Sequence, residues 1–391
     1  MGTLIGTGFV PQPNADKKQI TTGADQTEKY LPYLKGKRVG MLVNQTSIIG
    51  KTLSVDSLRA LGVDIKYIFG PEHGFRANAS NGAHVADEID AKTGIPIISL
   101  YGKKRKPSPE EMAAIDLMIF DIQDVGCRFY TNINTLADIM DACAEAGKEL
   151  IIFDRPNPNG FVDGPVLDMK LKSGIGKFPI PITHGMTIAE FAQMVNGEGW
   201  LPEKRQCKLK IIPLKNYSHD MDYTLPVSPS PNLNTQQSII LYPSLCLFEG
   251  TYVSQGRGTY MPFTVLGSPE LKGIYDFTFT PVSIPGKSET PLHQNQACYG
   301  LDLRKYDISK FRKAGKINLQ WMIEMYKAYP HKEKFFDSSL SKQMGSIDKL
   351  AGTTKFKEQI IAGVSEEEIR KSWEPELSFY KTMRKKYVLY P

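Results

Sequence analysis

The sequence predicts an α/β protein in which a doubly wound parallel sheet is joined to a second, smaller α+β domain. Three observations lead to this prediction. Short apolar runs recur along the first half of the chain, helical patterns lie between them, and this alternation stops near residue 200. Apolar runs without polar alternation are typical of strands buried on both faces, as in a parallel sheet covered by helices.

The elements of the sheet domain follow in order along the chain. Strands are predicted at residues 37–44, 65–69, 95–100, 117–122 and 150–153. Residues 53–61 form a helical pattern that ends at Gly62. A second helix carries Leu136, Ile139, Met140 and Cys143 on one face and ends at Gly147. Thr187 and Glu190 have the spacing of a capping box, which predicts another helix start.

The predicted domain boundary lies where the alternation of strand and helix patterns stops. Prolines interrupt residues 200–235, and the later half mixes a strand-like run at residues 274–280 with amphipathic helices. We therefore expect a poorly ordered lead-in at residues 1–30, the sheet domain at residues 31–205, and the α+β domain at residues 206–391.

Composition excludes several classes of protein. Hydrophobic residues make up 41% of the 391 residues and the net charge is only +6, so we expect a globular core and no nucleic-acid partner. The longest basic run, at residues 103–106, precedes a Pro-Ser-Pro turn and is expected to be a solvated loop. No apolar stretch approaches the roughly 18 residues of a membrane helix. We also expect no signal peptide in this chain, because Met1 is followed by a polar, Gly-rich segment.

Cofactor and metal sites are not predicted either. Five scattered cysteines without C-x-x-C and six histidines without ligand spacing argue against a metal. Residues 50–52 (Gly-Lys-Thr) resemble the end of a phosphate-binding loop, but Gln45 stands where that motif needs glycine. No Gly-x-Gly-x-x-Gly follows the first strand, which argues against a dinucleotide.

Polar residues follow each predicted strand. In an open parallel sheet, ligands bind outside the carboxyl ends of the strands, so these residues are candidates for one site. The set comprises Asn44, Gln45, Glu72, His73, Asp121, Asp124, Arg128, Tyr130, Asp154 and Asn157. Asp121 and Asp154 end strongly apolar runs, where a carboxylate destabilises the fold unless it is paired or used. The alternative is that these loops are polar only because they are loops.

Glu72 is the strongest single candidate for a catalytic residue. Pro71 and Gly74 fix the turn around it, and phenylalanines flank it. Apolar surroundings raise a carboxyl pKa, as a general acid at neutral pH requires. Glu72 could instead cap a helix or pair with Arg76, and His73 could position Glu72 or touch substrate.

The second domain offers fewer candidates. Arg257 lies between two glycines in Ser-x-Gly-Arg-Gly, and Pro-Ser-Pro-Asn at residues 229–232 predicts a rigid turn on the rim of the same site. Carboxylates, arginines and aromatic residues such as Tyr101, Tyr130 and Phe161 suit a carbohydrate that bears an acidic group. The residues alone thus predict an enzyme with a cleft or a sugar-binding protein.

Six motifs together give a more specific expectation. They are V-G-M-L-V-N-Q-T (39–46), F-G-P-E-H-G (69–74), F-D-I-Q-D-V-G-x-R-F-Y-T (120–131), D-R-P-N-P (154–158), H-G-M-T (184–187) and S-x-G-R-G (254–258). This set resembles the NamZ-like exo-β-N-acetylmuramidases of peptidoglycan recycling, formerly a domain of unknown function. The resemblance implies release of N-acetylmuramic acid from non-reducing ends of cell-wall glycan, a Rossmann-like first domain, and a cleft completed by the second domain.

The resemblance also implies where the chemistry lies. The favoured catalytic residue of the family maps to Glu72, and His184 joins the substrate-binding candidates. Asp124 is our choice for the second catalytic group, and we expect Asp121, Asp124 or Asp154 within about 10 Å of Glu72. Either Arg257 or Arg128 is expected to bind the lactyl carboxylate of the sugar. The substrate implies a periplasmic or secreted protein.

Several alternatives remain open at the level of sequence. The chain could be a non-catalytic cell-wall sugar-binding protein, or a hydrolase or transferase acting on phosphate or acyl groups. Retention, inversion and participation of the substrate's own acetamido group are all compatible with the motifs. The sequence makes no prediction of the oligomeric state.

Overall fold

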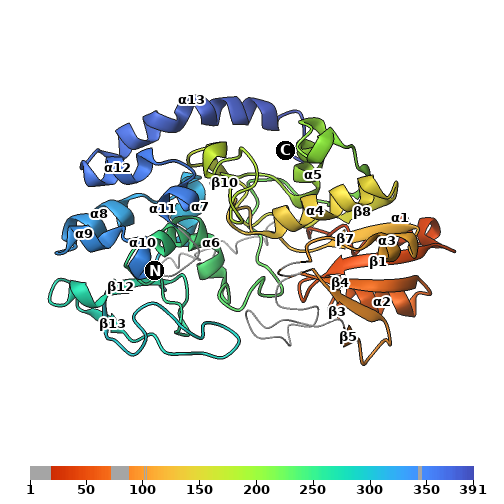
Figure 1. Cartoon of the computed structure of the whole chain (residues 1–391), viewed down its shortest axis with the longest axis horizontal. Coiled ribbons are helices and arrows are strands. Elements are labelled where there is room, and N and C mark those ends of the chain that lie inside the picture. Colours follow the sequence, from red (N-terminus) through yellow and green to blue (C-terminus); the bar gives the residue numbers. More distant parts are fainter. Residues whose placement is uncertain (1–18, 72–87, 101, 103, 342–345) are drawn as a thin grey trace, which may run out of the picture.

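The computed structural model describes residues 19–71, 88–100, 102, 104–341 and 346–391. The chain is built from two halves (Figure 1). The N-terminal half holds the main sheet, and the C-terminal half holds a small antiparallel sheet and most of the later helices. Helix α13 (Glu366–Arg384) runs along the top of Figure 1, from above the C-terminal half toward α5. The mixed α/β class expected from the sequence is confirmed.

The main sheet has seven strands in the order β11-β8-β7-β1-β4-β6-β5. Their bounds are β1 Arg38–Val43, β4 Asp64–Gly70, β5 Glu88–Ile89, β6 Pro96–Ser99, β7 Leu117–Asp121, β8 Glu149–Phe153 and β11 Lys208–Ile212. All neighbours pair in parallel except β5, which is antiparallel to β6. The five predicted strands are confirmed as β1, β4, β6, β7 and β8. Because the order runs outward in both directions from β1, the winding reverses between β1 and β7, which is where such sheets bind ligands.

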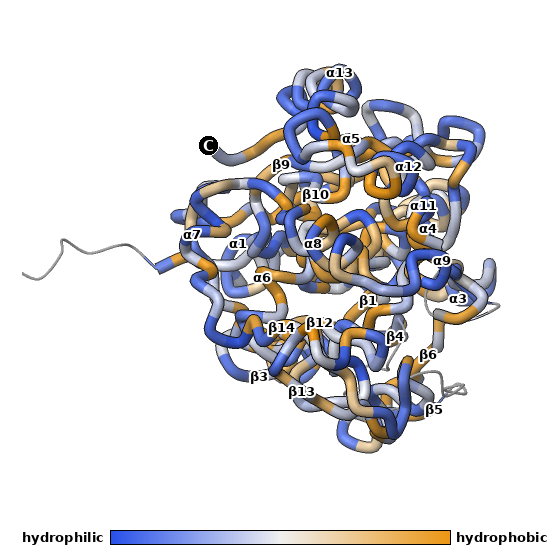
Figure 2. Tube along the Cα trace, turned by 90° about the vertical axis from the view of Figure 1, so that its left-hand side faces the viewer, coloured by the Kyte–Doolittle hydropathy of each residue, from blue (hydrophilic) through white to orange (hydrophobic). Residues whose placement is uncertain are grey.

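Helices cover both faces of this sheet. Their bounds are α1 Thr27–Leu34, α2 Ser54–Ala60, α3 Pro109–Ala113, α4 Asn132–Glu145 and α5 Ile188–Gly197. Alternate residues of each strand point to opposite faces, so Leu42 of β1 packs with α4 and α5 while Met41 packs with α1 and α2. Apolar segments accordingly gather inside the molecule in Figure 2. The capping box of Thr187 and Glu190 at the start of α5 is confirmed.

Two parts of the sheet domain lie beyond its expected limits. Strand β11 pairs with β8, so the sheet extends past residue 205, where we expected the first domain to end. Residues 19–30, from the expected lead-in, pack against the sheet, where the Gly23 amide donates to the Asp154 carbonyl at 2.9 Å. Any added Cβ at Gly23 would lie 2.3 Å from the Ile212 carbonyl oxygen, so this close approach requires glycine.

The C-terminal half packs around an apolar core to which Val125, Phe129 and Ile182 of the first half also belong. Its sheet has the order β12-β14-β13, formed by Val265–Ser268, Cys298–Asp302 and Phe277–Phe279. The helices of this half are α6 Gln236–Leu245, α7 Ile308–Ala314, α8 Gln320–Ala328, α9 Lys332–Phe335, α10 Ser338–Ser341, α11 Ile347–Ala351, α12 Lys355–Ile361 and α13. Short 3₁₀ turns occur at Met169–Leu171, Pro202–Lys204, Cys246–Gly250 and Pro269–Leu271, and two-residue strands at Ile48–Ile49, Thr52–Leu53, Val162–Asp163 and Thr183–His184.

Side chains of the last helix tie the halves together. The Tyr380 hydroxyl of α13 donates to the His184 carbonyl at 2.8 Å, and Tyr380 and Met383 belong to the core of the first half. Within the ranges that the structure describes, no helix is both long and apolar enough to span a membrane.

Candidate active-site cleft

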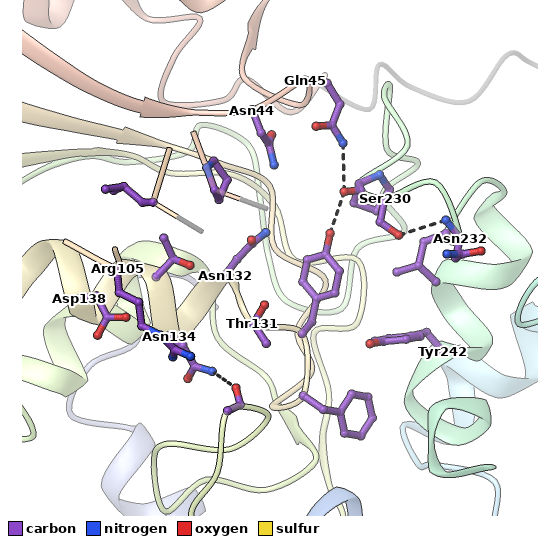
Figure 3. A pocket seen from close by; sticks show the side chains of 18 of the residues that line it. Asn44, Gln45, Arg105, Thr131, Asn132, Asn134, Asp138, Ser230, Asn232 and Tyr242 are labelled. Atoms are coloured by element: carbon purple, nitrogen blue, oxygen red, sulfur yellow. Dashed lines mark hydrogen bonds between the residues drawn. The ribbon is translucent and has the colours of Figure 1, made fainter. Parts of the chain in front are cut away.

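A cleft of about 620 Å³ lies between the halves, at the point where the winding of the sheet reverses (Figure 3). This volume suits a small ligand such as a sugar. Its described lining is made of Asn44, Gln45, Pro71, Leu100, Gly102, Arg105, Phe129, Tyr130, Thr131, Asn132, Asn134, Thr135, Asp138, Gly174, Pro229, Ser230, Asn232, Leu233, Tyr242, Arg257 and Phe263.

Two predicted residues hold the cleft's rim in place. The Gln45 Nε2, after β1, donates to the carbonyls of Ser228 and Pro229 at 3.2 and 3.1 Å. The Tyr130 hydroxyl donates to the Pro229 carbonyl at 2.8 Å. Both contacts reach the turn at residues 229–232, which the sequence placed on the rim and which does line the cleft. Asn44 also lines the cleft, and its Oδ1 accepts from the Thr46 amide at 2.9 Å.

The first turn of α4 adds amide groups that sequence reasoning missed. Asn132 Nδ2 donates to the Gln123 carbonyl at 3.0 Å, and Asn134 Nδ2 donates to the Gly174 carbonyl at 2.8 Å. Figure 3 shows both side chains at the cleft. Amides held in this way suit the hydroxyl and acetamido groups of a sugar. The available signal was Thr-Asn-Ile-Asn immediately before the apolar face of the helix.

The second half contributes Arg257 and the residues that hold it. The Arg257 Nε donates to Glu249 Oε1 at 2.7 Å, and its guanidinium carbon lies 5.2 Å from the centroid of the Phe263 ring. Glu249 is fully buried and also accepts from Gln255 Nε2 at 3.0 Å. Sequence reasoning missed Glu249, because no motif or periodicity links it to Arg257.

One cation on the cleft wall comes from the basic run at residues 103–106. We expected this run to be only a solvated loop, but Arg105 lines the cleft. Figure 3 draws it on the same side as Asn134 and Asp138, away from Asn232 and Tyr242. Both carboxylate oxygens of Asp138 lie 2.8 Å from the Lys177 Nζ. The run was misjudged because the sequence does not show which of its side chains have partners.

Asp121 lies deep in the protein and is not part of the cleft lining. Its Oδ1 accepts from the Arg155 Nε at 2.7 Å, and both side chains are almost completely buried. Arg155 Nη2 also donates to the Ile48 carbonyl at 2.9 Å. This ion pair therefore ties the loop after β7 to the loop after β8.

Asp154 anchors the C-terminus rather than lining the cleft. It accepts from the Thr187 hydroxyl at 2.8 Å, the Ala189 amide at 3.1 Å and the Tyr390 hydroxyl at 2.6 Å. Burial raises the pKa of Asp154 to about 7, although the Tyr390 and Thr187 hydrogen bonds oppose this shift and the Glu190 charge adds to it.

Asp124, Asn157 and His184 are buried and are also absent from the lining. Asp124 Oδ2 accepts from the Gly126 amide at 2.7 Å and lies 3.5 Å from His184 Nε2. Asn157 donates from Nδ2 to the Met186 carbonyl at 3.0 Å. These contacts fix loops behind the cleft wall.

Arg128 is fully buried and donates to three backbone carbonyls. Nη1 reaches Pro165 and Ile180 at 2.9 and 2.8 Å, and Nη2 reaches Leu350 at 2.8 Å. Burial lowers the pKa of Arg128 to about 9. Because Leu350 belongs to α11, this guanidinium joins the two halves instead of facing the cleft.

Glu72, His73 and Tyr101 lie outside the described residues. Pro71, which immediately precedes Glu72, lines the cleft. Phe161 packs edge-on against Phe311 with ring centroids 6.1 Å apart and is not among the lining residues. Across the described ranges, no three His, Cys, Asp or Glu side chains are grouped closely enough to hold a metal ion.

Comparison with known proteins gives full-length matches. The family profile described as exo-β-N-acetylmuramidase NamZ, N-terminal, matches residues 39–237, and the corresponding C-terminal profile matches residues 240–390. The peptidoglycan β-N-acetylmuramidase NamZ of Bacillus subtilis (strain 168) is 39% identical over 410 aligned residues, which cover 100% of this chain and 96% of that protein.

Two crystal structures of DUF1343 family proteins from Bacteroides fragilis NCTC 9343 are similar in fold. One has a TM-score of 0.87 and 45% sequence identity, and the other has a TM-score of 0.79 and 28% identity. Each alignment covers 95% of this chain and 99% of the other.

Proposed function

Because this chain belongs to the NamZ exo-β-N-acetylmuramidase family and is by homology a peptidoglycan glycoside hydrolase, we propose that Glu72 is its general acid. In this proposal, the protein releases N-acetylmuramic acid from the non-reducing ends of peptidoglycan fragments, and Glu72 protonates the oxygen of the leaving sugar.

The observation that carries the proposal is the position of Pro71. This residue lines a cleft rich in amide, hydroxyl and aromatic groups, and Glu72 is the next residue in the chain. Phe69, three residues before Glu72 in the chain, is fully buried, so the end of strand β4 that leads to Glu72 is apolar.

The second catalytic group is a separate question. None of Asp121, Asp124 and Asp154 lines the cleft, and the one carboxylate in its described lining, Asp138, is held by Lys177. We therefore favour participation of the substrate's 2-acetamido group as the nucleophile, oriented by the amides of the cleft wall. In that role Asn132 and Asn134 bind the acetamido group, and His73 positions Glu72.

Arg257 is proposed as a substrate ligand on the opposite wall. Its guanidinium is fixed by Glu249 and stacked near Phe263, so little conformational entropy is lost when it donates to the sugar. Asn44 and Gln45 complete this set from the first half. Since the substrate is a cell-wall glycan, we infer a periplasmic or secreted location.

The test is incubation of the purified chain with a chromogenic β-N-acetylmuramide and with a disaccharide that ends in N-acetylmuramic acid. We expect release of the chromophore and of free N-acetylmuramic acid, with little release from the matching β-N-acetylglucosaminide. Saturable binding of the disaccharide without any cleavage would instead support a non-catalytic sugar-binding protein.

A further inference from the structure

The charges on the cleft wall do not balance. Its described lining contains three charged side chains, Arg105, Asp138 and Arg257. Asp138 is neutralised by Lys177 at 2.8 Å, and Arg257 is neutralised by the buried Glu249 at 2.7 Å. The described wall therefore carries one positive charge, that of Arg105, without a carboxylate to offset it.

The neighbours of Arg105 explain why it stays uncompensated. Lys104 pairs with Glu111 of α3 at 2.6 Å, and Lys106 pairs with Asp141 of α4. These two ion pairs fasten the loop on either side of Arg105 and occupy the nearby acidic groups. Within the described chain, no hydrogen bond or ion pair engages the Arg105 guanidinium, which is exposed at the cleft.

The first turn of α4 reinforces the positive potential beside Arg105. Thr131, Asn132 and Asn134 of this turn line the cleft, and the turn contains no acidic residue. The Thr131 side chain makes no capping hydrogen bond. A helix N-terminus carries a partial positive charge, so both features favour an anionic group at this end of the cleft.

We propose that Arg105 binds the free lactyl carboxylate of the N-acetylmuramoyl unit and so sets the preference for this sugar over N-acetylglucosamine. The inference rests on the proposed function, because it assigns a part of that substrate to one wall of the cleft. A guanidinium binds a carboxylate through two parallel hydrogen bonds, and an uncompensated one gives up no existing partner. Arg257 would have to share its charge with Glu249, and Arg128 does not reach the cleft.

The experiment compares two substrates on the same enzyme. One is a chromogenic β-N-acetylmuramide with a free lactyl carboxylate, and the other is its lactyl carboxamide, which has nearly the same shape but no charge. Arg105→Gln should lower kcat/KM about tenfold for the carboxylate and leave the carboxamide unchanged. Added salt should slow the wild-type enzyme on the carboxylate substrate only, because an exposed ion pair is screened. Arg105→Lys should retain part of the preference.

Matched variants make the result decisive. Arg304→Gln removes an exposed arginine that pairs with Asp302 away from the cleft, and neither substrate should be affected. An equal loss on both substrates by Arg105→Gln would show a structural role, and an unchanged preference ratio would place lactyl recognition elsewhere. Either result overturns the inference while leaving the glycosidase intact. Failure of the wild-type enzyme to cleave any muramide would instead contradict the proposed function.

Discussion

The polar residues that follow β1 and β4 differ sharply from the carboxylates at the ends of β7 and β8. After the first two strands, Asn44, Gln45 and Pro71 line the cleft. Asp121, the last residue of β7, and Asp154, which follows β8, turn into the protein and are completely buried. Farther along the loop after β7, Phe129, Tyr130 and Thr131 do line the cleft. All four loops leave the same edge of one parallel sheet, so position after a strand does not by itself place a residue in the site.

The partners available to each loop account for the difference. Asp121 meets Arg155, and Asp154 meets two hydroxyls and a helix amide, so burial of both carboxylates is compensated. The side chain of Gln45 instead reaches the turn at residues 229–232, in the opposite half. The two buried carboxylates thus support the sheet edge, whereas Asn44, Gln45 and Pro71 line the cleft.

The largest expected effect comes from Glu72→Gln. If the loop after β4 carries the general acid, turnover of the chromogenic muramide should fall about 10²- to 10⁴-fold, because the amide cannot donate the catalytic proton. Folding should be unaffected, since the two side chains are nearly the same size. Steady-state kinetics together with thermal unfolding measure both effects.

Glu88→Gln provides the control, because Glu88 is an exposed glutamate on the edge strand β5. This variant should keep wild-type kinetics. If Glu72→Gln retained more than half of the wild-type kcat, the general acid would have to be another residue.

Asp121→Asn should show the opposite behaviour, with a large loss of stability and little change in the chemistry of the folded protein. The substitution leaves the Arg155 guanidinium buried without its counter-charge, which costs about 3–5 kcal/mol. Denaturant unfolding measures the loss, and kcat per folded molecule measures catalysis.

The double variant Asp121→Asn with Arg155→Gln should recover part of the lost stability, because no unpaired charge remains. A drop in kcat comparable to that of Glu72→Gln, at unchanged stability, would return Asp121 to the catalytic candidates.

The sequence predicted the strands more reliably than the site. Five apolar runs became strands of the main sheet because burial on both faces leaves a clear signal in the chain. The capping box at Thr187 was equally predictable from the sequence, since it depends on two residues that lie one helical turn apart. The role of Asp154, the carboxylate that follows β8, could not be predicted from the sequence, because its partner Tyr390 lies 236 residues away in the chain.

The ion pairs that neutralise charged side chains at the cleft could not be predicted from the sequence for the same reason. Glu249 of the 3₁₀ turn Cys246–Gly250 neutralises Arg257, and Lys177, which lies in a loop, neutralises Asp138 of helix α4. The exposed charge of Arg105 emerges only after these partners are known. Contacts between charged side chains depend on the tertiary structure, whereas the hydrophobic periodicity of strands and helices is present in the sequence itself.

Asp154→Asn should change how stability depends on pH. The folded-state pKa of about 7 lies above the usual unfolded value of about 3.9, so between these values the folded protein holds a proton that the unfolded chain has lost. The stabilisation is therefore fully present below about pH 4 and is lost as pH rises to about 7. Within this window the wild-type free energy of unfolding should fall relative to that of the variant by about 1.4 kcal/mol per pH unit.

Denaturant titrations of both proteins across this window give the difference, in which other titrating groups cancel. Parallel curves for wild type and variant would mean that Asp154 stays ionised in the folded protein and that its hydrogen bonds outweigh its burial.

The smallest effect should come from Tyr130→Phe, which tests whether the rim turn matters for substrate binding. The change removes the hydrogen bond to the Pro229 carbonyl and should cost about 0.5–1.5 kcal/mol of stability. Because the turn at residues 229–232 lines the cleft, KM for the muramide should rise a few-fold while kcat changes little. Tyr30→Phe is the matched control. Its hydroxyl also donates to a backbone carbonyl, that of Ala24 at 2.6 Å, but on the face of the sheet covered by α1 and α2, and Tyr30 is not among the residues that line the cleft. The control should lose similar stability and keep its KM. If both variants raised KM equally, loss of stability rather than the rim would explain the effect, and the division between cleft-forming and supporting residues would fail at Tyr130.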